Sequence, residues 1–191
     1  MENTDKLTKQ ATMLAALTRA QSTFITQNRP KEAFEQLLEV LLSVTESEYG
    51  FIGEVMYDDN DKPYLKAFAI TDISWDEATR KFYAENAPAG LEFTNTDSLF
   101  GHVMTSGKPV IANNPKEDPR RAGIPSGHPP LNAFLGLPFF QKDELLGMVG
   151  VANRHGGYDK ELTEFLTPLL STCAHLIRGR RLEQEREHSQ T

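Results

Sequence analysis

The chain has 191 residues, of which 39% are hydrophobic and 25% are charged, and its formal net charge is −7. This is the composition of an ordinary globular protein, and an acidic balance with no basic stripe excludes a general nucleic-acid binder. The single cysteine excludes an internal disulfide, no apolar run approaches the ~20 residues of a membrane span, and the polar first residues lack the cationic start of a signal peptide, so a cytoplasmic protein is expected.

Two helices are predicted at the start of the chain. Apolar residues recur at three- and four-residue steps over 5–27. A short heptad seam also fits part of this pattern, at Leu7, Ala11, Leu14 and Leu17 or Thr18. Pro30 separates the first helix from the second, because the residue before a proline leaves helical geometry and a proline suits a first helical turn. The second helix, over about 31–46, has a broad apolar face and is expected to be buried.

The next segments predict a β-hairpin. Tyr49–Tyr57 and Tyr64–Thr71 are rich in β-branched and aromatic residues and are separated by a polar turn at 58–62. This turn contains several Asp and Asn residues, but it lacks the Gly and the distal Glu of a calcium loop. Strict alternation along the second strand places Phe68 and Ile70 on the same face.

The middle of the chain is predicted as short elements. Ser74, with Glu77 three residues later, has the spacing of a capping box and predicts the start of a helix. After it we expect an edge strand within 86–95, a helix over Leu99–Thr105 capped by Asp97 or Ser98 and ended by Gly107, and a strand at Val110–Ala112. Residues 113–130 then contain five of the eleven prolines, which indicates a long loop of the kind that often covers a functional site.

A second hairpin is predicted from two apolar runs, Asn132–Phe140 and Leu145–Ala152, on either side of the polar turn 141–144. Both runs are rich in Leu, Phe and Val, so their strands are expected to be buried. They are interrupted by Gly136, Gly147 and Gly150. A glycine inside a strand usually marks a bulge or a close approach by another backbone.

A long helix is predicted over Tyr158–Arg186. Its apolar stripe ends near Ile177 and includes Cys173, which is expected to be a core residue and not a reactive thiol. From Arg178 onward nearly every residue is charged or polar, which predicts a solvated linker helix that Gly179 could loosen.

These motifs resemble one family. Phe134-Leu135-Gly136-Leu137-Pro138, a polar turn, Gly147-Met148-Val149-Gly150-Val151-Ala152-Asn153 and a final helix resemble the C-terminal half of a GAF domain, and Ser106-Gly107-Lys108-Pro109-Val110 is similar to an earlier segment of that family. The resemblance covers roughly 31–178. It implies an α/β (α+β) fold with a central antiparallel sheet of about six strands, helices on both faces and long terminal helices. Residues 1–30 would then be a dimerisation helix, and 179–191 the start of a signalling helix.

The resemblance also implies a function. Such domains are regulatory sensors in signal-transduction proteins, including bacterial two-component systems, and they couple a small-molecule pocket to the C-terminal helix and to an output module such as a kinase or a cyclase. It further implies a homodimer formed through the N- and C-terminal helices. Two alternatives stay open: a dimerisation or interaction module with no ligand, and a stand-alone enzyme on the same fold.

In GAF domains the ligand lies between one sheet face and a loop-and-helix cover, which by position would be residues 91–131 here. An apolar pocket with a few placed polar groups is the usual form of such a site. The resemblance places the ligand-binding residues at Phe68, Ile70, Trp75, Phe93, Phe100, Asn113, Arg120, Arg121, His128, Asn132 and Phe134. Among these, a loop arginine could grip a carboxylate or phosphate through two hydrogen bonds, and a histidine titrates near neutral pH.

The identity of the ligand is left open. Asn153-Arg154 and Tyr158 match only the start of the pattern shared by cyclic-nucleotide GAF domains, whose Asp-Glu end is missing near Leu162-Thr163, so a cyclic nucleotide is not favoured. Covalent bilin attachment and methionine sulfoxide reduction both use cysteines in the pocket loops, which have none here. The chain also has no G-x-S-x-G, P-loop, HxxxH or CxxC motif, so neither catalytic residues nor a metal site are expected.

Overall fold

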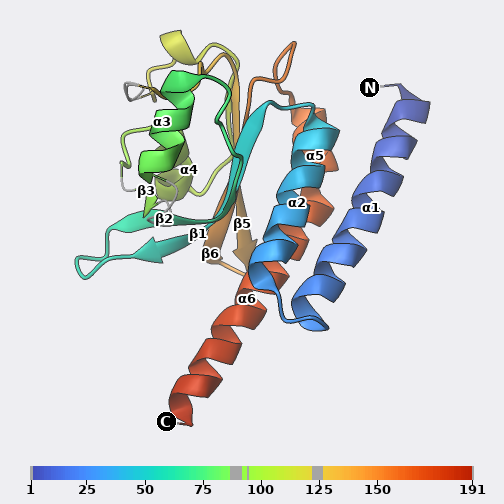
Figure 1. Ribbon diagram of the computed structural model, residues 1–191, viewed down its shortest axis with the longest axis vertical. Helices are drawn as coiled ribbons and strands as arrows, with labels where there is room; N and C mark the ends of the chain where they lie inside the picture. The colour runs from blue at the N-terminus through green and yellow to red at the C-terminus, as the bar shows by residue number, and fades with distance from the viewer. Residues whose placement is uncertain (1, 87–91, 94, 122–126, 191) are drawn as a thin grey trace.

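The computed structural model describes residues 2–86, 92–93, 95–121 and 127–190, which form one sheet with helices on both of its faces (Figure 1). The strands are β1 (Tyr49–Tyr57), β2 (Pro63–Ile70), β3 (Glu92–Phe93), β4 (Val110–Ala112), β5 (Phe134–Gln141) and β6 (Glu144–Ala152). The helices are α1 (Asn3–Ile25), α2 (Pro30–Thr45), α3 (Glu77–Asn86), α4 (Leu99–Ser106), α5 (Lys160–Phe165) and α6 (Thr167–Ser189), with a 3-10 turn, η2, at Pro115–Glu117. The six-stranded antiparallel sheet has the order β3-β2-β1-β6-β5-β4, so the expected fold class is confirmed.

The central strands of the sheet are β1 and β6. The β5–β6 hairpin pairs Phe134 with Ala152 at its open end and Gln141 with Glu144 at its turn, which confirms the predicted pairing of the two apolar runs. The turn between the two strands has two residues, and the first of them, Lys142, has φ 53°. A positive φ at this position lets the twist of a two-residue turn match the right-handed twist of the strands on either side. Strand β6 then pairs with β1 over its second half.

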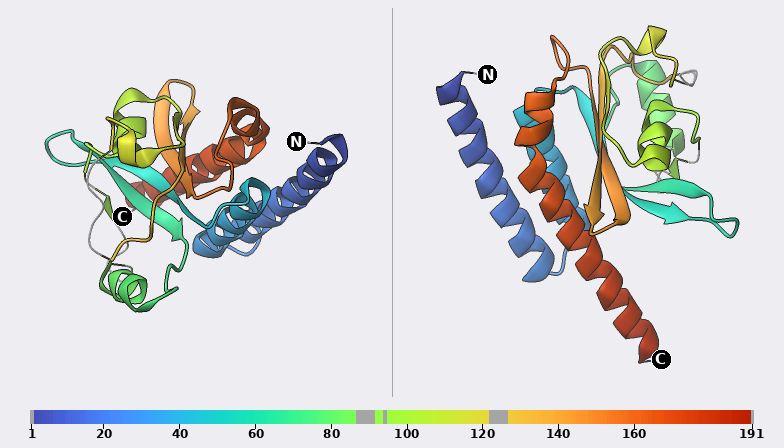
Figure 2. Two further views of the ribbon diagram at one scale, coloured as in Figure 1. Left: turned by 90° about the horizontal axis from the view of Figure 1, so that it is seen from above. Right: turned by 180° about the vertical axis from the view of Figure 1, so that it is seen from behind.

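One face of the sheet is covered by α2 and α6, and α1 packs outside them (Figures 1 and 2). The apolar face predicted for α2 is buried here, since Phe34, Leu37 and Leu41 are all 0% exposed. Ile52 and Val149 of the two central strands are equally buried against this layer. Because burying each such side chain contributes about 1.5–3 kcal/mol, this layer is the main core and fixes α6 against the sheet.

On the opposite side of the sheet, α4 packs against the strands and α3 lies further out on the same side (Figure 2). On this face Gly136 and Gly150 lie directly opposite each other in β5 and β6. A Cβ on Gly150 would lie 2.5 Å from the ring of Phe51, and one on Gly136 would lie 2.9 Å from the ring of Phe134. The close approach at these two glycines is therefore made by side chains, including Val103 at 2.7 Å from a Cβ on Gly136, whereas at Gly147 it is made by a backbone, the Gly53 carbonyl, as predicted.

The structure corrects two of the predicted helices. The helix predicted over Tyr158–Arg186 is two helices, α5 and α6, which are separated at Leu166. The proline two residues later has no N–H to continue the α5 hydrogen bonds and instead stands in the first turn of α6. Helix α3 is capped by Asp76 and not by Ser74: Asp76 Oδ1 accepts from Thr79 N at 2.8 Å, and Thr79 Oγ1 accepts from Asp76 N at 3.0 Å.

Candidate functional site

The sheet face under α3 and α4, where the resemblance places a ligand, is occupied by side chains of the described residues. Phe134 is 7% exposed and belongs, together with the half-buried Phe100, to an apolar cluster on this face. Other members of the cluster are Val55, Leu65, Leu99, Val103, Met104, Val110, Ala112 and Met148. Phe93 pairs with Leu65 through its backbone, and its side chain lies outside the described part of the chain.

Phe68 and Ile70 lie on opposite faces of β2, which corrects the expected strict alternation. The β1–β2 register shifts by one residue in the middle of the strands, so β2 carries a bulge at Phe68. A bulge changes the face on which the following side chains lie. Ile70 stays on the face under α3 and α4, whereas Phe68 stacks on Phe34 of α2 with ring centroids 4.6 Å apart and has the Arg180 guanidinium 4.8 Å from its ring. Phe68 is therefore part of the helix-layer core.

The predicted arginines do not form an open anion clamp. Arg120 donates from Nε and Nη2 to the two carboxylate oxygens of Asp118, at 2.9 and 2.7 Å, and from Nη2 to the Ile111 carbonyl at 3.1 Å. The Arg120 guanidinium holds the pKa of Asp118 below its ordinary value, so this pair stays charged and fixes the loop after β4. Arg121, by contrast, is exposed.

Two predicted residues, Trp75 and His128, meet in an aromatic cluster with Tyr49 and Phe82. The Tyr49 ring lies 5.6 Å from that of Trp75 and 6.0 Å from that of His128, and the Phe82 ring lies 5.6 Å from His128. Burial lowers the pKa of His128, so its imidazole is neutral at pH 7, and Nδ1 lies 2.7 Å from the Pro129 carbonyl. These rings brace the loop before β5 against α3.

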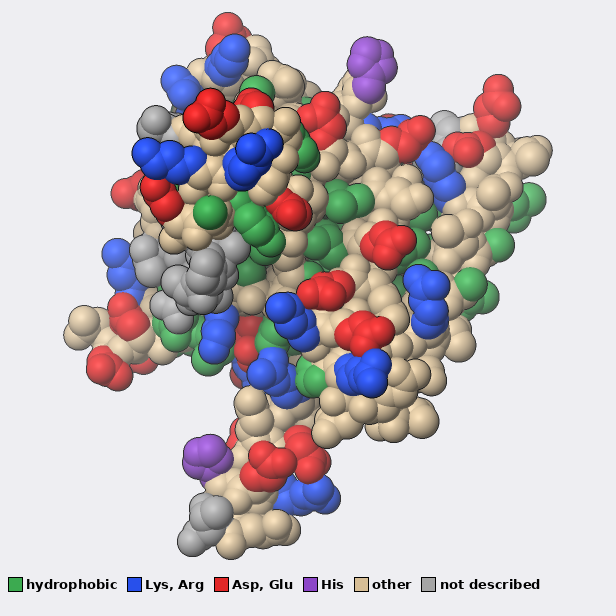
Figure 3. Space-filling model, viewed as in Figure 1, with side chains coloured by type: hydrophobic (Ala, Val, Ile, Leu, Met, Phe, Trp, Pro, Cys, Tyr) green, Lys and Arg blue, Asp and Glu red, His purple; other side chains and the backbone are tan. Residues whose placement is uncertain are grey.

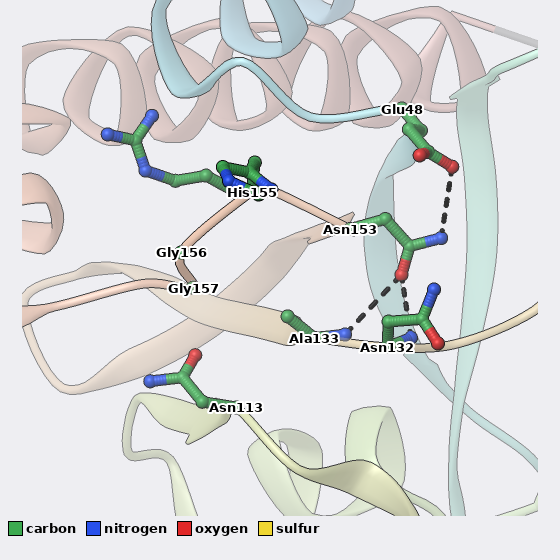
Figure 4. A pocket seen from close by; sticks show the side chains of 9 residues that line it. Glu48, Asn113, Asn132, Ala133, Asn153, His155, Gly156 and Gly157 are labelled. Atoms are coloured by element: carbon green, nitrogen blue, oxygen red, sulfur yellow. Dashed lines mark hydrogen bonds between the residues drawn. The ribbon is translucent and has the colours of Figure 1, made fainter.

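The same loop forms one wall of a polar pocket at the adjacent end of the sheet (Figure 4). The pocket has a volume of about 370 Å³ and is lined by Glu48, Asn113, Asn132, Ala133, Asn153, Arg154, His155, Gly156 and Gly157. Its walls come from the start of β1, the end of β4, the start of β5 and the end of β6. The structure thus brings together two predicted site residues, Asn113 and Asn132, and adds Glu48, Asn153 and His155, which sequence reasoning missed.

Asn153 holds these walls together. It has φ 67°, a left-handed conformation that asparagine adopts more readily than most residues, and it is 9% exposed. Its Oδ1 accepts from the backbone N–H groups of Asn132 and Ala133, at 2.7 and 3.4 Å, and its Nδ2 donates to Glu48 at 3.2 Å and to the Pro130 carbonyl at 2.7 Å (Figure 4). This buried amide is fully hydrogen-bonded and fixes the pocket in one shape.

Asn113 fixes the opposite wall. Its side chain donates to the Tyr158 carbonyl and accepts from the Tyr158 N–H, both at 2.9 Å. A Cβ on Gly157 would lie 2.6 Å from Asn113 Oδ1, so this glycine lets the loop after β6 approach the asparagine. The Tyr158 hydroxyl is in turn 2.7 Å from Ser47 Oγ, which ties the loop to the segment before β1.

The pocket presents few groups for direct recognition. Among the described residues, the side chains of Asn132 and His155 have no hydrogen-bonding partner, and both are exposed. Glu48 adds a carboxylate, while Arg154 is engaged by the Thr45 carbonyl at 3.0 Å and by Glu46 at 2.7 Å. The groups left for a ligand are therefore an amide, an imidazole and the Glu48 oxygen that Asn153 does not bond, and they favour a small polar molecule that carries hydrogen-bond donors.

At the opposite end of the same two strands, α6 is fastened to the sheet by Arg181. This side chain donates from Nε to Glu54 of β1, from Nη1 to Glu144 of β6 at 3.1 Å and from Nη2 to the Val55 carbonyl at 3.1 Å. The Arg181 and Glu54 side chains are only 21% and 11% exposed. The residues from Arg178 onward were expected to be solvated, and the structure corrects this for Arg181, whereas Gly179 is exposed as expected.

The one cysteine and the potential metal ligands do not form a site within the described part of the chain. Cys173 is fully buried in the helix layer, and burial raises its pKa to about 12. Within residues 2–86, 92–93, 95–121 and 127–190 there is no group of three His, Cys, Asp or Glu residues that could hold a metal ion. In the same ranges, no helix combines the length and the apolar character that crossing a membrane requires.

The chain belongs to the GAF domain family, because the family model matches residues 27–178. A segment of 87 residues, 45% of the chain, is 31% identical to a methyl sulfide methyltransferase-associated sensor of Methanosarcina acetivorans, and this match spans 9% of that protein. The fold is similar to the GAF domain of a phosphoenolpyruvate-protein phosphotransferase from Coxiella burnetii (TM-score 0.69, 17% identity, 92% of this chain and 98% of that one). It is also similar to a free methionine-R-sulfoxide reductase from Neisseria meningitidis (TM-score 0.65, 11% identity, 92% and 93%).

Proposed function

We propose that this chain is a regulatory, small-molecule-sensing GAF domain of a signal-transduction protein, in which the polar pocket binds the ligand and α6 carries the response to an output module such as a kinase or a cyclase. The observation that supports the proposal is that the two central strands, β1 and β6, connect the pocket to the residues that hold Arg181 of α6. Glu48 and Asn153, at the pocket, flank the start of β1 and the end of β6, whereas Glu54 and Glu144, which hold Arg181, lie at the other end of the same strands.

The distance between the two sites suits transmission along a rigid element. From Glu48 to Glu54 there are six residues, which correspond to about 20 Å along an extended strand. Beyond Arg181, α6 continues to Ser189 and leaves the sheet (Figures 1 and 2). A small shift of β1 against β6 at the pocket would therefore change how two acidic residues hold one arginine.

The proposed mechanism is a shift between two arrangements of α6. A ligand can bias such an equilibrium only if it binds one arrangement more tightly than the other. A ligand that contacts both Glu48 and Asn132 would hold the start of β1 and the start of β5 at a fixed separation. We propose that fixing this separation selects one arrangement of the hydrogen bonds from Arg181 to Glu54 and Glu144, and hence one position of the C-terminal helix.

A second function has an observation in its favour. The face under α3 and α4 is occupied by side chains such as Phe134 and Val103. A domain with a filled sheet face suits a dimerisation or interaction module that binds no ligand. A stand-alone enzyme, as in the sulfoxide reductase neighbour, has less support, because the one cysteine, Cys173, is buried on the other side of the sheet.

A pocket variant with a matched control tests the sensor proposal. Asn132→Leu places an apolar side chain at the pocket while its backbone N–H can still bond Asn153, and Asn60→Leu makes the same change at the exposed β1–β2 turn. Native mass spectrometry of the purified chain would identify a retained small molecule, and a thermal-shift screen of amines, amides and amino acids would extend the search.

We expect a compound that raises the melting temperature of the wild type and of Asn60→Leu but not of Asn132→Leu. The same compound should change hydrogen exchange in residues 178–189. If no compound binds, or if one stabilises all three proteins equally, the pocket is not a sensing site and the interaction module is favoured.

A further inference from the structure

We propose that the ligand of the polar pocket is a small organic cation, namely a primary amine that carries a second hydrogen-bonding group and neither a carboxylate nor a phosphate. This inference rests on the proposed sensing function and names the chemical class of the ligand. It depends on Glu48, Asn132 and His155, the lining residues whose side chains keep hydrogen-bonding capacity for a ligand.

Glu48 carries the charge that the pocket leaves unbalanced. Its side chain is exposed, and its Oε2 accepts from the neutral Asn153 amide at 3.2 Å. Among the residues that the structure describes, no Lys, Arg or His side chain forms an ion pair with Glu48. An ionised carboxylate only accepts hydrogen bonds, and it attracts a positive charge in addition. The group that suits its remaining oxygen best is therefore a positively charged donor.

The positive charges near the pocket are already neutralised within the chain. Arg154 Nη1 lies 2.7 Å from Glu46 and 3.0 Å from the Thr45 carbonyl. Glu46 is also paired with Lys9 at 3.3 Å, and Lys9 with Asp5 at 3.4 Å. This network joins two acidic and two basic side chains, so it has no net charge. A carboxylate or phosphate would have to displace Glu46 from Arg154 and would be repelled by Glu48, so the pocket selects against anions.

Asn132 and His155 offer the second contact. Both side chains are exposed, and within the described part of the chain neither has a hydrogen-bonding partner. A side-chain amide both donates and accepts, and an imidazole can do either. In Figure 4, Glu48 and Asn132 both lie beside the Asn153 amide, and they come from the segments before β1 and β5. A ligand that bridges them needs an ammonium group at one end and an amide or a hydroxyl at the other.

The size of the pocket limits the ligand to a compact molecule. Its volume of about 370 Å³ lies near the lower end of the ~300–1,000 Å³ range of small-molecule sites. Asn113 and Asn153 hold its walls through hydrogen bonds to backbone groups, so the pocket does not widen unless these bonds break. A short amine fits this space better than a nucleotide or a peptide does.

The wider charge distribution also favours a cation. The net charge of the chain is −7, and Figure 3 shows acidic side chains from the top of the molecule down to the C-terminal helix. Burial and, after it, the Glu48 charge raise the pKa of the Tyr49 hydroxyl, so this neighbour of Glu48 stays neutral. A negative field raises the local concentration of cations and lowers that of anions.

Three compounds with the same carbamoylethyl body test the inference: β-alaninamide ends in an ammonium group, succinamide in a neutral amide and succinamate in a carboxylate. Each is titrated into the isotope-labelled full chain, and the amide NMR shifts of Glu48, Asn132 and residues 153–157 are followed. The ionic strength is held constant, because salt screens exposed charges. Compounds this small bind weakly, so we expect a dissociation constant on the order of 1 mM for β-alaninamide.

The charge of the end group should set the order of affinity. We expect succinamide to bind about tenfold more weakly than β-alaninamide, a ratio between the limits for a charge pair in bulk water and at a protein surface. Succinamate should not shift the pocket amides over the same range. Asn132→Leu should weaken both compounds that bind, because it removes the second contact.

A charge variant with a matched control makes the test specific for Glu48. Glu48→Gln keeps an acceptor for Asn153 and removes the charge, so it should weaken β-alaninamide about tenfold and leave succinamide within about twofold. Asp59→Asn removes the same charge at the exposed β1–β2 turn, beyond the far end of β1, and should bind all three compounds as the wild type does.

The outcomes separate this inference from the sensing proposal. The ligand class is overturned if succinamide or succinamate binds as tightly as β-alaninamide, if none of the three shifts the pocket amides, or if Glu48→Gln keeps the preference for the amine. Binding of succinamate at the pocket would leave the sensing proposal standing. β-Alaninamide that binds as expected but leaves hydrogen exchange in residues 178–189 unchanged would instead contradict the sensing proposal and support the ligand class.

Discussion

Replacing Arg181 by Met tests how strongly α6 is fastened to the sheet. Met keeps the aliphatic stem and suits a helix, but it removes the guanidinium that bonds Glu54, Glu144 and the Val55 carbonyl. Removing one partner of a fully buried ion pair costs about 3–5 kcal/mol, and an exposed pair contributes about 0–1 kcal/mol. Glu54 is 11% exposed and Arg181 is 21% exposed, so this pair lies nearer the buried limit. We expect a loss of about 3 kcal/mol in the free energy of unfolding.

The measurement is urea unfolding of the variant beside a control in the same helix. Arg186→Met breaks an ion pair with Glu183 whose side chains are 67% and 54% exposed, and it should lower the free energy of unfolding by less than about 0.5 kcal/mol. The double variant Glu54→Gln, Arg181→Met should recover part of the loss, because the buried carboxylate is then no longer left unpaired. If Arg181→Met lowers the free energy of unfolding by no more than Arg186→Met does, Arg181 does not fasten α6 to the sheet. The proposed transmission from the pocket to α6 would then have no contact to carry it.

Four further predictions concern Gly150 in β6, Gly179 in α6, Gln36 in α2 and His128 in the loop before β5. Gly150→Ala should lower the free energy of unfolding by about 1–3 kcal/mol, because the new Cβ would lie 2.5 Å from the Phe51 ring. Gly179→Ala should raise it by about 0.5–1 kcal/mol, because alanine favours a helix more than glycine does and the new Cβ would meet no other atom within 4 Å. Urea titrations measure both changes. Gln36→Met should raise the melting temperature, since Gln36 Oε1 is buried without a hydrogen bond. Burial lowers the pKa of His128 in the folded protein below its ordinary value of 6.5. The unfolded state therefore binds more protons between the two pKa values, and the stability falls as the pH drops through them. His128→Phe should reduce this fall, measured as the melting temperature at a series of pH values.

Elements with local signals were predicted well. Ser98 caps α4 by accepting from Gly101 N at 3.0 Å, and Gly107 ends the helix with φ 66°, both as their residue types indicate. The β5–β6 hairpin follows from two apolar runs separated by a short polar turn. Pro168 is a local signal that the prediction of one long helix over Tyr158–Arg186 missed, because a proline within a helical pattern marks a boundary.

The misplaced residues depend on contacts between distant segments. Phe68 was assigned to the wrong face because nothing in its own strand marks the bulge, which arises in the pairing with β1. Arg181 lies in a charged run that is typical of a solvated helix, yet it meets Glu54, 127 residues away in the sequence. A run of charged residues therefore predicts exposure only where no other element places oppositely charged side chains beside it.

The candidate pocket was predicted only in part for the same reason. Asn113 and Asn132 were selected for their place in the loops, but the pocket exists because Asn153 connects segments that begin at Glu48 and at Pro130. In the sequence, Asn153 stands out only as the last residue of the second hairpin strand's motif and as the start of a cyclic-nucleotide pattern. A polar residue directly after a buried central strand is the signal that could have identified it.

Hydrogen exchange measured by mass spectrometry on residues 178–189 tests most directly whether the pocket end of the sheet controls α6. Asn153→Ala loosens the pocket end, and Leu17→Ala, a change in α1, provides a destabilised control; denaturant conditions can be chosen so that both have the same global stability. The account predicts faster exchange around Arg181 in Asn153→Ala than in the control, although Asn153 lies at the opposite end of β6. Equal exchange of this segment in the two variants would contradict the account.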